Sequence, residues 1–235
     1  MSRQAPSCKA ITGRDLPYPF LVMVTDRGVY GSPANGEGAR LASLIAAAEA
    51  CARAGIDAVQ IRERGLSDAR LLTLVADITG RIAGTRARVL VNDRLDIAMM
   101  AGASGVHLPA NALPCARART IVPESFVIGR SVHGIEEAMA EAAAGGCDYL
   151  LFGTVFASQS KPAGHPVAGI DALARICAAV PIPVVAIGGM TADRARAVAG
   201  AGAAGLAGIG LFAAGTKQAL ADTVGRIRDA FTGGQ

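Results

Sequence analysis

The sequence predicts an α/β protein whose fold is a single (β/α)8 TIM barrel. The chain has 235 residues, of which 51% are hydrophobic and 18% charged, a composition typical of a globular protein with a large core. Short runs rich in Val, Ile, Leu and Phe recur along it, separated by Ala-rich segments with helical periodicity. Strands that are apolar throughout are buried on both faces, which requires a parallel sheet covered by helices. Eight strand–helix units in a chain of this length favour a closed barrel.

The strands are expected at Phe20–Thr25, Ala58–Arg64, Val89–Asp93, Gly105–Leu108, Phe126–His133, Tyr149–Phe156, Pro183–Gly189 and Gly205–Phe212. Helical periodicity is clear at Ala39–Ala54, Asp68–Ile82, Ile135–Ala144, Ile170–Ala179 and Asp193–Ala199, and each segment ends near Gly or Pro. An open, doubly wound sheet is the alternative, but no Gly-x-Gly-x-x-Gly follows the first strand. We expect one barrel domain at residues 19–235 and a loose extension at residues 1–18.

Charge and cysteine content limit the function classes. The chain has 23 Lys and Arg against 19 Asp and Glu, and these charges are interspersed, so neither nucleic acid nor a membrane is an expected partner. The five cysteines are widely spaced and form no Cys-x-x-Cys pair, which disfavours a zinc site and a disulfide framework. The sequence has no signal-peptide pattern and no long apolar stretch. These features indicate a soluble, cytoplasmic protein.

Polar residues at the carboxyl ends of barrel strands are the first candidates for chemistry. In the second strand, period-two alternation places Gln60, Arg62 and Arg64 on one side. The two guanidinium groups suit phosphate or carboxylate, although a salt-bridged strand end with Glu63 is the alternative. After the third strand, Asn92 and Asp93 either bind a ligand or cap the next helix, and Asp93 is a candidate ligand for a divalent cation.

The fifth strand offers a hydroxyl and an imidazole. Ser131 and His133 have the same parity, so they are expected to point together at the barrel mouth. His133 is the best candidate for proton transfer because imidazole titrates near neutrality, although a lone histidine is more often structural. His107 lies inside a buried run and His165 in a Gly/Pro loop, so both rank lower.

Two further segments have the composition of ligand-binding loops. After the sixth strand, Ser158, Ser160 and Lys161 are candidates for a flexible loop that closes on a ligand, whereas a solvated lysine is the alternative. Glycines follow the seventh and eighth strands, where barrels of this type frequently bind phosphate through backbone N–H groups. The predicted phosphate-binding residues are Gly188, Gly189, Gly208, Ile209 and Gly210.

Taken together, these segments resemble the thiamine phosphate synthase/TenI family from about Phe20 to Phe212. The family's motifs agree in order with Gln60-x-Arg62-x-Arg64, where Arg64 replaces a lysine, and with Asn92-Asp93, Gly105–Leu108, Ser158-x-Ser160-Lys161 and Ala186–Gly189. The resemblance implies one of two activities. The synthase joins hydroxymethylpyrimidine diphosphate to a thiazole phosphate with Mg²⁺, and Asp93 would be a metal ligand. In that branch a second Mg²⁺ carboxylate stands where this chain has Ala112.

The loss of that carboxylate, together with Ser131-Val132-His133 and residues 151–156, favours the TenI branch, whose activity is a thiazole tautomerase without a metal. The expected substrate is a carboxythiazole phosphate, aromatised through proton transfer by His133. Arg62 or Arg64 would pair with its carboxylate, Lys161 would close over it, and the glycine loops would hold its phosphate. The family position of Gly210 is often Ser. The alternatives are the Mg²⁺-dependent synthase and a non-catalytic ligand-binding or regulatory protein, and a homo-oligomer is left open.

Overall fold

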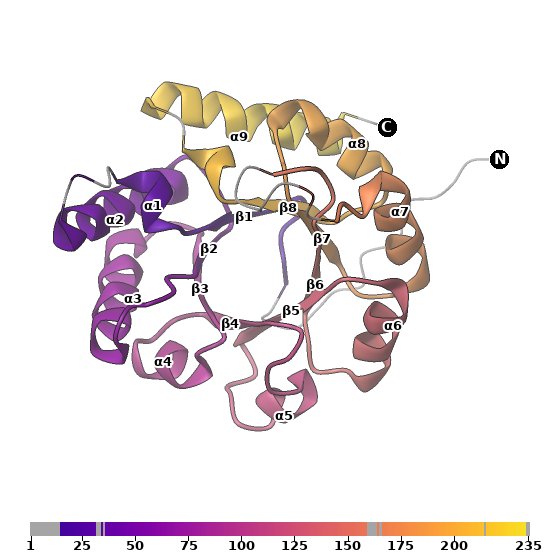
Figure 1. Ribbon diagram of the computed structural model, residues 1–235, viewed down its shortest axis with the longest axis horizontal. Coiled ribbons are helices and arrows are strands. Elements are labelled where there is room, and N and C mark those ends of the chain that lie inside the picture. Colours follow the sequence, from indigo (N-terminus) through magenta and orange to yellow (C-terminus); the bar gives the residue numbers. More distant parts are fainter. Residues whose placement is uncertain are drawn as a thin grey trace.

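The fold is a closed eight-stranded parallel barrel, which confirms the predicted fold class. The computed structural model describes residues 15–31, 34, 36–158, 164, 166–213 and 215–233. The strands pair in sequence order from β1 to β8, and β8 returns to pair with β1 in the register Phe20↔Gly205 to Met23↔Gly208. Figure 1 shows the strands as a ring with the helices outside it. The carboxyl ends of all eight strands therefore meet at one mouth.

The strands are shorter than the apolar runs that predict them. They span β1 Phe20–Val24, β2 Ala58–Ile61, β3 Arg88–Asn92, β4 Gly105–Leu108, β5 Val127–Val132, β6 Tyr149–Phe152, β7 Val184–Ile187 and β8 Gly205–Gly208. Residues past these ends, which the sequence assigns to strands, leave the barrel and form loops. After β8 the chain turns at once into the 3-10 helix η2, Gly210–Phe212.

The helices between the strands follow the predicted order. They are α1 Arg27–Tyr30, α2 Glu37–Arg53, α3 Asp68–Ile82, α4 Leu95–Met100, α5 Cys115–Arg119, α6 Ile135–Ala144, α7 Gly169–Ala179, α8 Ala195–Gly200 and α9 Lys217–Thr232, with the 3-10 helix η1 at Ala192–Arg194. Helices α3 and α6 begin and end where the periodicity places them. Helices α1, α4 and α5 have four to six residues, too short to give a helical period.

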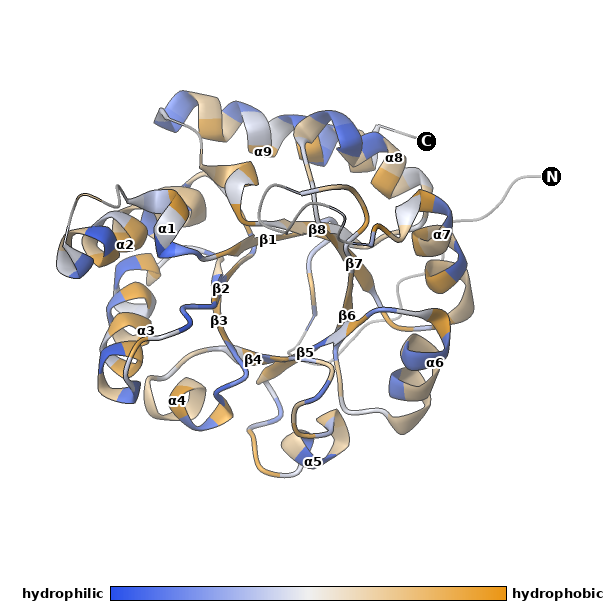
Figure 2. Cartoon of the chain, in the orientation of Figure 1, coloured by the Kyte–Doolittle hydropathy of each residue, from blue (hydrophilic) through white to orange (hydrophobic). Residues whose placement is uncertain are grey.

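The core has two parts, one inside the barrel and one between strands and helices. Inside, alternate strand residues such as Phe20, Leu90 and Tyr149 form one cluster, and the larger cluster packs the outer faces of the strands against the helices. Figure 2 shows the strands mainly hydrophobic and the helices hydrophobic toward them. Gly129 is required in β5 because a Cβ there would lie 2.2 Å from the ring of Tyr149.

The amino-terminal end of the barrel is closed by the chain that leads into β1. Leu16 packs against the interior cluster, and the Asp15 carbonyl accepts a hydrogen bond from Arg88 at 3.2 Å. Of the extension expected at residues 1–18, residues 1–14 lie outside the described residues. Within the described part of the chain, no helix is long and apolar enough to cross a membrane.

Candidate anion-binding site at the barrel mouth

The loop after β7 is held so that its N–H groups face away from the neighbouring β6 loop. The Ile187 carbonyl accepts a hydrogen bond from the Val155 N–H at 2.9 Å, and the Gly188 carbonyl accepts one from the Phe156 N–H at 3.1 Å. In a trans peptide, the C=O and the following N–H point in opposite directions. The N–H groups of Gly188 and Gly189 are therefore directed away from the β6 loop.

Glycine is required at both of these positions. Gly188 has φ +102 and Gly189 φ +61, in the left-handed region that side chains disfavour. A Cβ on Gly188 would lie 2.6 Å from Thr154 Cγ2, and one on Gly189 would lie 2.3 Å from the Ala157 carbonyl oxygen. The Gly189 carbonyl accepts from the guanidinium of Arg194, which also stacks over the Phe156 ring. No motif in the sequence predicts this role of Arg194.

The loop after β8 is held in the same manner, from α1 and α2. The Tyr30 hydroxyl donates to the Ile209 carbonyl at 2.6 Å, and the Cys51 thiol donates to the Phe212 carbonyl at 3.7 Å. Gly208 lies tightly against Leu211, because a Cβ there would come within 2.6 Å of Leu211 Cβ. A Cβ on Gly210 would meet nothing within 4 Å, so this side of Gly210 is open.

These two loops form a cradle of backbone donors. Among the described residues, no acceptor is hydrogen-bonded to the N–H groups of Gly188, Gly189, Ile209 or Gly210. Because β7 and β8 are neighbours in the barrel, with Ile187 beside Ala207, the two loops begin side by side. Unbonded N–H groups at this position are suited to a phosphate. We call the Gly188, Gly189, Ile209 and Gly210 N–H groups the phosphate cradle.

The residues at the end of β2 form a second polar region. Gln60 is buried inside the barrel and donates from Nε2 to Asn92 Oδ1 at 3.2 Å, so the structure brings these two predicted residues together. Gln60 Oε1 has no hydrogen-bond partner among the described residues. A buried acceptor without a partner is costly, and a ligand donor would satisfy it.

Arg62 and Arg64 follow β2 as a pair of cations, but the strand ends at Ile61, so the predicted alternation does not extend to them. The backbone N–H of Arg62 donates to Thr25 Oγ1 at 2.9 Å, which fixes this strand end to β1. Burial lowers the pKa of the Arg62 guanidinium, and the charge of Arg64 lowers it further. The alternative prediction is a salt bridge between these arginines and Glu63. Glu63 does form a salt bridge, but with Arg27, at 3.0 Å. No sequence pattern identifies Arg27.

His107 and Ser131 meet inside the barrel. His107 Nε2 lies 2.8 Å from Ser131 Oγ and its Nδ1 lies 3.1 Å from the Tyr149 hydroxyl. Burial lowers the pKa of His107 to about 3, helped by the charges of Arg130 and Arg62. The imidazole is therefore neutral at neutral pH, and it fixes the Ser131 side chain below the mouth.

This buried imidazole predicts a pH dependence of stability. The pKa of His107 is lower in the folded protein than its ordinary value near 6.5, so between pH 3 and 6.5 the unfolded chain binds more protons and stability falls as the pH falls. From pH 7 to pH 5 we expect His107 to contribute a loss of about 2 kcal/mol in the free energy of unfolding. Urea unfolding of wild type and His107→Gln at both pH values measures it, and equal losses in the two proteins would contradict it.

His133 does not point into the barrel mouth together with Ser131, although strand alternation predicts that it does. Strand β5 ends at Val132, so the alternation that places Ser131 inward does not extend to His133. The His133 side chain is 66% exposed, and its Nδ1 lies 3.4 Å from Glu137 Oε2 in the first turn of α6. The backbone N–H of His133 donates to the same oxygen at 2.6 Å. The structure therefore pairs His133 with Glu137 and not with Ser131, and its catalytic role stays a prediction.

Asp93 is an exposed carboxylate directly after β3, at the mouth. It has φ +69, and its N–H donates to the His107 carbonyl at 2.8 Å. In the described ranges, no group of three or more His, Cys, Asp and Glu side chains could hold a metal ion. The β4–α5 loop, which includes Ala112, is held through its carbonyls by the buried Arg130 guanidinium, at 2.9 Å from the Pro109 and Ala110 oxygens.

The predicted ligand-closing loop is described only at its edges. Ser158 lies at the end of the described segment, whereas Ser160 and Lys161 lie outside the described residues. On the far side of the loop, the Ala168 N–H donates to the Thr154 carbonyl at 2.8 Å and the Gly169 N–H to the Val155 carbonyl at 3.2 Å. The chain therefore returns to the residues that hold the β7 loop.

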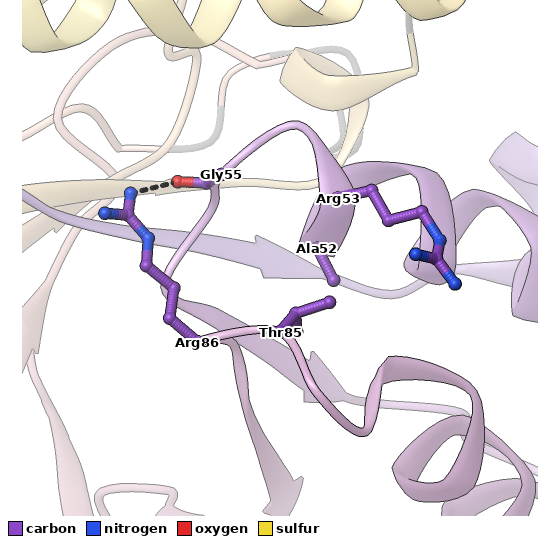
Figure 3. Close-up of a pocket in the computed structure, with 5 residues that line it drawn as sticks. All are labelled: Ala52, Arg53, Gly55, Thr85 and Arg86. Carbon is purple, nitrogen blue, oxygen red and sulfur yellow. Dashed lines mark hydrogen bonds between the residues drawn. The ribbon is translucent and has the colours of Figure 1, made fainter.

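A hollow at the opposite end of the barrel does not compete with the mouth as a candidate site. It has a volume of about 450 Å³ and is shown in Figure 3. Its two arginines are exposed and already paired, Arg53 with Glu49 and Arg86 with Asp57. The lining residues are Ala52, Arg53, Gly55, Thr85 and Arg86.

A closed parallel barrel with unbonded backbone N–H groups after β7 and β8 defines a TIM-barrel protein with a candidate anion-binding site at its mouth. The family model described as thiamine monophosphate synthase, TMP-TENI, matches residues 33–212. The chain therefore belongs to the thiamine monophosphate synthase family and is an enzyme of thiamine biosynthesis.

Relatives and solved structures agree with this family. A thiamine-phosphate synthase of Methanoculleus marisnigri is 42% identical over 80% of this chain and 84% of its own length. That of Anaeromyxobacter dehalogenans is 43% identical over 69% of this chain and 72% of its own length. The structure of thiamine phosphate pyrophosphorylase from Pyrococcus furiosus has a TM-score of 0.75 at 27% identity, covering 92% of this chain and 96% of its own. These names do not favour the tautomerase branch that Ala112 and the Ser131-Val132-His133 segment predict.

Proposed function

We propose that the protein is a thiamine phosphate synthase, which joins hydroxymethylpyrimidine diphosphate to a thiazole phosphate. The observation that carries this proposal is the pair of cations Arg62 and Arg64. The pKa of Arg62 is lowered by burial and by the charge of Arg64, so a ligand with several negative charges relieves both effects. A diphosphate carries more negative charge than a single carboxylate, so it is the better ligand for this pair of cations. The names of the relatives support the same reaction.

The chain's residues bind and orient the two substrates. The phosphate cradle holds the thiazole phosphate, and Arg62 and Arg64 bind the diphosphate of the pyrimidine. Gln60 Oε1, buried without a partner among the described residues, accepts a hydrogen bond from the pyrimidine. The C–O bond between the pyrimidine methylene and the diphosphate breaks, and its electron pair leaves with pyrophosphate. The lone pair of the thiazole nitrogen then forms the C–N bond to the methylene carbon.

The protein supplies only part of a Mg²⁺ site. Mg²⁺ is commonly held by one or two carboxylates together with substrate phosphates and water. Asp93 supplies one exposed carboxylate, so the residues fit an ion held mainly by the diphosphate and water. When bound, the ion would neutralise negative charge on the leaving pyrophosphate. Arg62 and Arg64 would share that task from the β2 side.

Thiazole tautomerisation is the second candidate function. Ala112 stands where the family's synthase branch has a Mg²⁺ carboxylate, and the Nδ1 atom of His133 has a carboxylate partner in Glu137 at 3.4 Å. An imidazole oriented by a carboxylate is suited to proton transfer. In this reaction the cradle would hold the phosphate of a carboxythiazole phosphate, and Arg62 would pair with its carboxylate.

The two candidates are separated by assaying one preparation for both reactions. With Mg²⁺ and both substrates we expect thiamine phosphate, and chelation of the metal should abolish its formation. Aromatisation of carboxythiazole phosphate without condensation, lost in His133→Ala, would instead establish the tautomerase. Binding of thiazole phosphate without either reaction would contradict both.

Ala112→Asp provides a sharper comparison. A second carboxylate in the loop after β4, the strand that pairs with β3, should raise synthase turnover about tenfold when Mg²⁺ is limiting, because a two-carboxylate site binds the ion more tightly. Asn111→Asp places the same charge one residue earlier in the loop and serves as the control. We measure turnover against Mg²⁺ concentration for both variants. Equal Mg²⁺ dependence in Ala112→Asp and wild type would contradict the expectation.

A further inference from the structure

We propose that Tyr30 is a positioning residue for the phosphate cradle, because its hydroxyl fixes the peptide between Ile209 and Gly210. The inference rests on the proposed function, since it requires that the loop after β8 binds a phosphate. Tyr30 lies at the end of α1, 179 residues before Ile209 in the chain. Its hydroxyl donates to the Ile209 carbonyl at 2.6 Å.

The geometry of the peptide gives this contact its effect. The C=O of Ile209 and the N–H of Gly210 belong to one planar trans peptide and point in opposite directions. When Tyr30 holds the carbonyl, the Gly210 N–H points away from α1. Strands β1 and β8 pair in parallel, so the loops that follow them, one carrying Tyr30 and the other Ile209, leave the same edge of the barrel.

Tyr30 is itself held rigidly. Helix α1 is capped at its amino end by Asp26, whose Oδ1 accepts from the Gly28 N–H at 2.8 Å. The Arg27 guanidinium and backbone N–H both donate to Glu63 after β2. Burial raises the pKa of the Tyr30 phenol far above its usual value, so the hydroxyl remains a donor. A half-buried, protonated phenol on a tethered helix is a fixed hydrogen-bond donor.

Among the described residues, no other side chain is hydrogen-bonded to the peptide between Ile209 and Gly210. The Cys51 thiol contacts the other end of η2, at the Phe212 carbonyl, over 3.7 Å. A thiol is a weak donor, so it holds its carbonyl less firmly than a phenol does. Loss of the Tyr30 hydroxyl therefore frees the Ile209–Gly210 peptide while η2 stays attached.

The test compares ligands with and without phosphate in Tyr30→Phe. By titration calorimetry we expect wild type to bind thiazole phosphate more tightly than the corresponding thiazole alcohol. The variant should bind the phosphate about three- to tenfold more weakly, as for loss of one hydrogen bond, with the alcohol unchanged. In synthase turnover, KM for thiazole phosphate should rise and kcat should stay within about twofold of wild type. Tyr18→Phe is the control, because Tyr18 is exposed and packs on Phe231 at the other end of the barrel.

The outcomes separate the inference from the proposed function. If wild type does not distinguish the phosphate from the alcohol, the phosphate cradle is wrong and the inference fails with it. If wild type distinguishes them and Tyr30→Phe does so equally well, the cradle stands and the role of Tyr30 is wrong. An equal loss of affinity for both ligands shows a general packing role and also overturns the inference. Inorganic phosphate as a competitor should likewise be about three- to tenfold weaker in Tyr30→Phe.

Discussion

Replacement of Asp57 by alanine is expected to lower the free energy of unfolding by about 3–5 kcal/mol, because the buried Leu21 N–H loses its acceptor and the partly buried Arg228 loses its ion-pair partner. Asp57 is 2% exposed and lies just before β2. Its Oδ2 accepts from the Leu21 N–H of β1 at 2.9 Å and from Arg228 of α9 at 2.8 Å. Arg86, before β3, lies 3.3 Å from Oδ1. One carboxylate thus joins β1, β2 and the last helix.

The reference for this prediction is an ion pair on the surface of the same helix. Arg226 of α9 pairs with Asp193, whose side chain is 82% exposed. Asp193→Ala should change the free energy of unfolding by less than about 1 kcal/mol, as is usual for exposed pairs. Urea unfolding of both variants at pH 7 measures the difference. An Asp57→Ala protein within about 1 kcal/mol of wild type would show that the buried pair contributes little net stability.

The fold could be predicted because its signals are local and repeated. Eight apolar runs separated by helical periods indicate a barrel without any knowledge of tertiary contacts. The ends of the strands could not be predicted in this way. Apolar residues continue after β6 and β8, so both Val155 and Phe212 belong to apolar runs, although Val155 lies in a loop and Phe212 in the 3-10 helix η2. Their side chains are buried against the outer core and not inside the barrel.

The site could be predicted where strand alternation places side chains. Gln60 and Asn92 meet, as expected for inward residues near the ends of neighbouring strands. The same alternation is wrong for His133, because β5 ends one residue before it. His107, ranked low as a buried histidine, is the imidazole that contacts Ser131. A histidine that is buried in a barrel strand can therefore still lie next to the candidate site.

The residues that no sequence pattern predicts share one property, since each acts on the backbone of another segment. Tyr30 and Arg194 hold carbonyls of the two cradle loops, and the Arg27 guanidinium donates to the Arg64 carbonyl after β2. Such contacts depend on where loops meet in space and leave no period or motif in the sequence. The glycines of the phosphate cradle could be predicted from the sequence, because the backbone conformation at these positions itself requires glycine.

Replacement of Gly189 by alanine is expected to lower kcat/KM about 100-fold, because displacement of a binding group by about 1 Å has effects of that size. A Cβ at this position would lie 2.3 Å from the Ala157 carbonyl oxygen and 2.8 Å from that of Phe156. Both contacts are with backbone, so the cradle or the β6 loop must move. Thiazole phosphate affinity by calorimetry and steady-state turnover measure the effect.

Gly84→Ala separates the steric effect from backbone strain. Gly84 has φ +84, in the same left-handed region as Gly189, but a Cβ there would meet nothing within 4 Å. It lies between α3 and β3, at the amino-terminal end of the strands. Both variants should lose about 1 kcal/mol of stability from strain, whereas only Gly189→Ala should lose phosphate affinity. If Gly189→Ala binds thiazole phosphate as tightly as Gly84→Ala does, the N–H groups after β7 do not hold the phosphate, and the anion must bind elsewhere at the mouth.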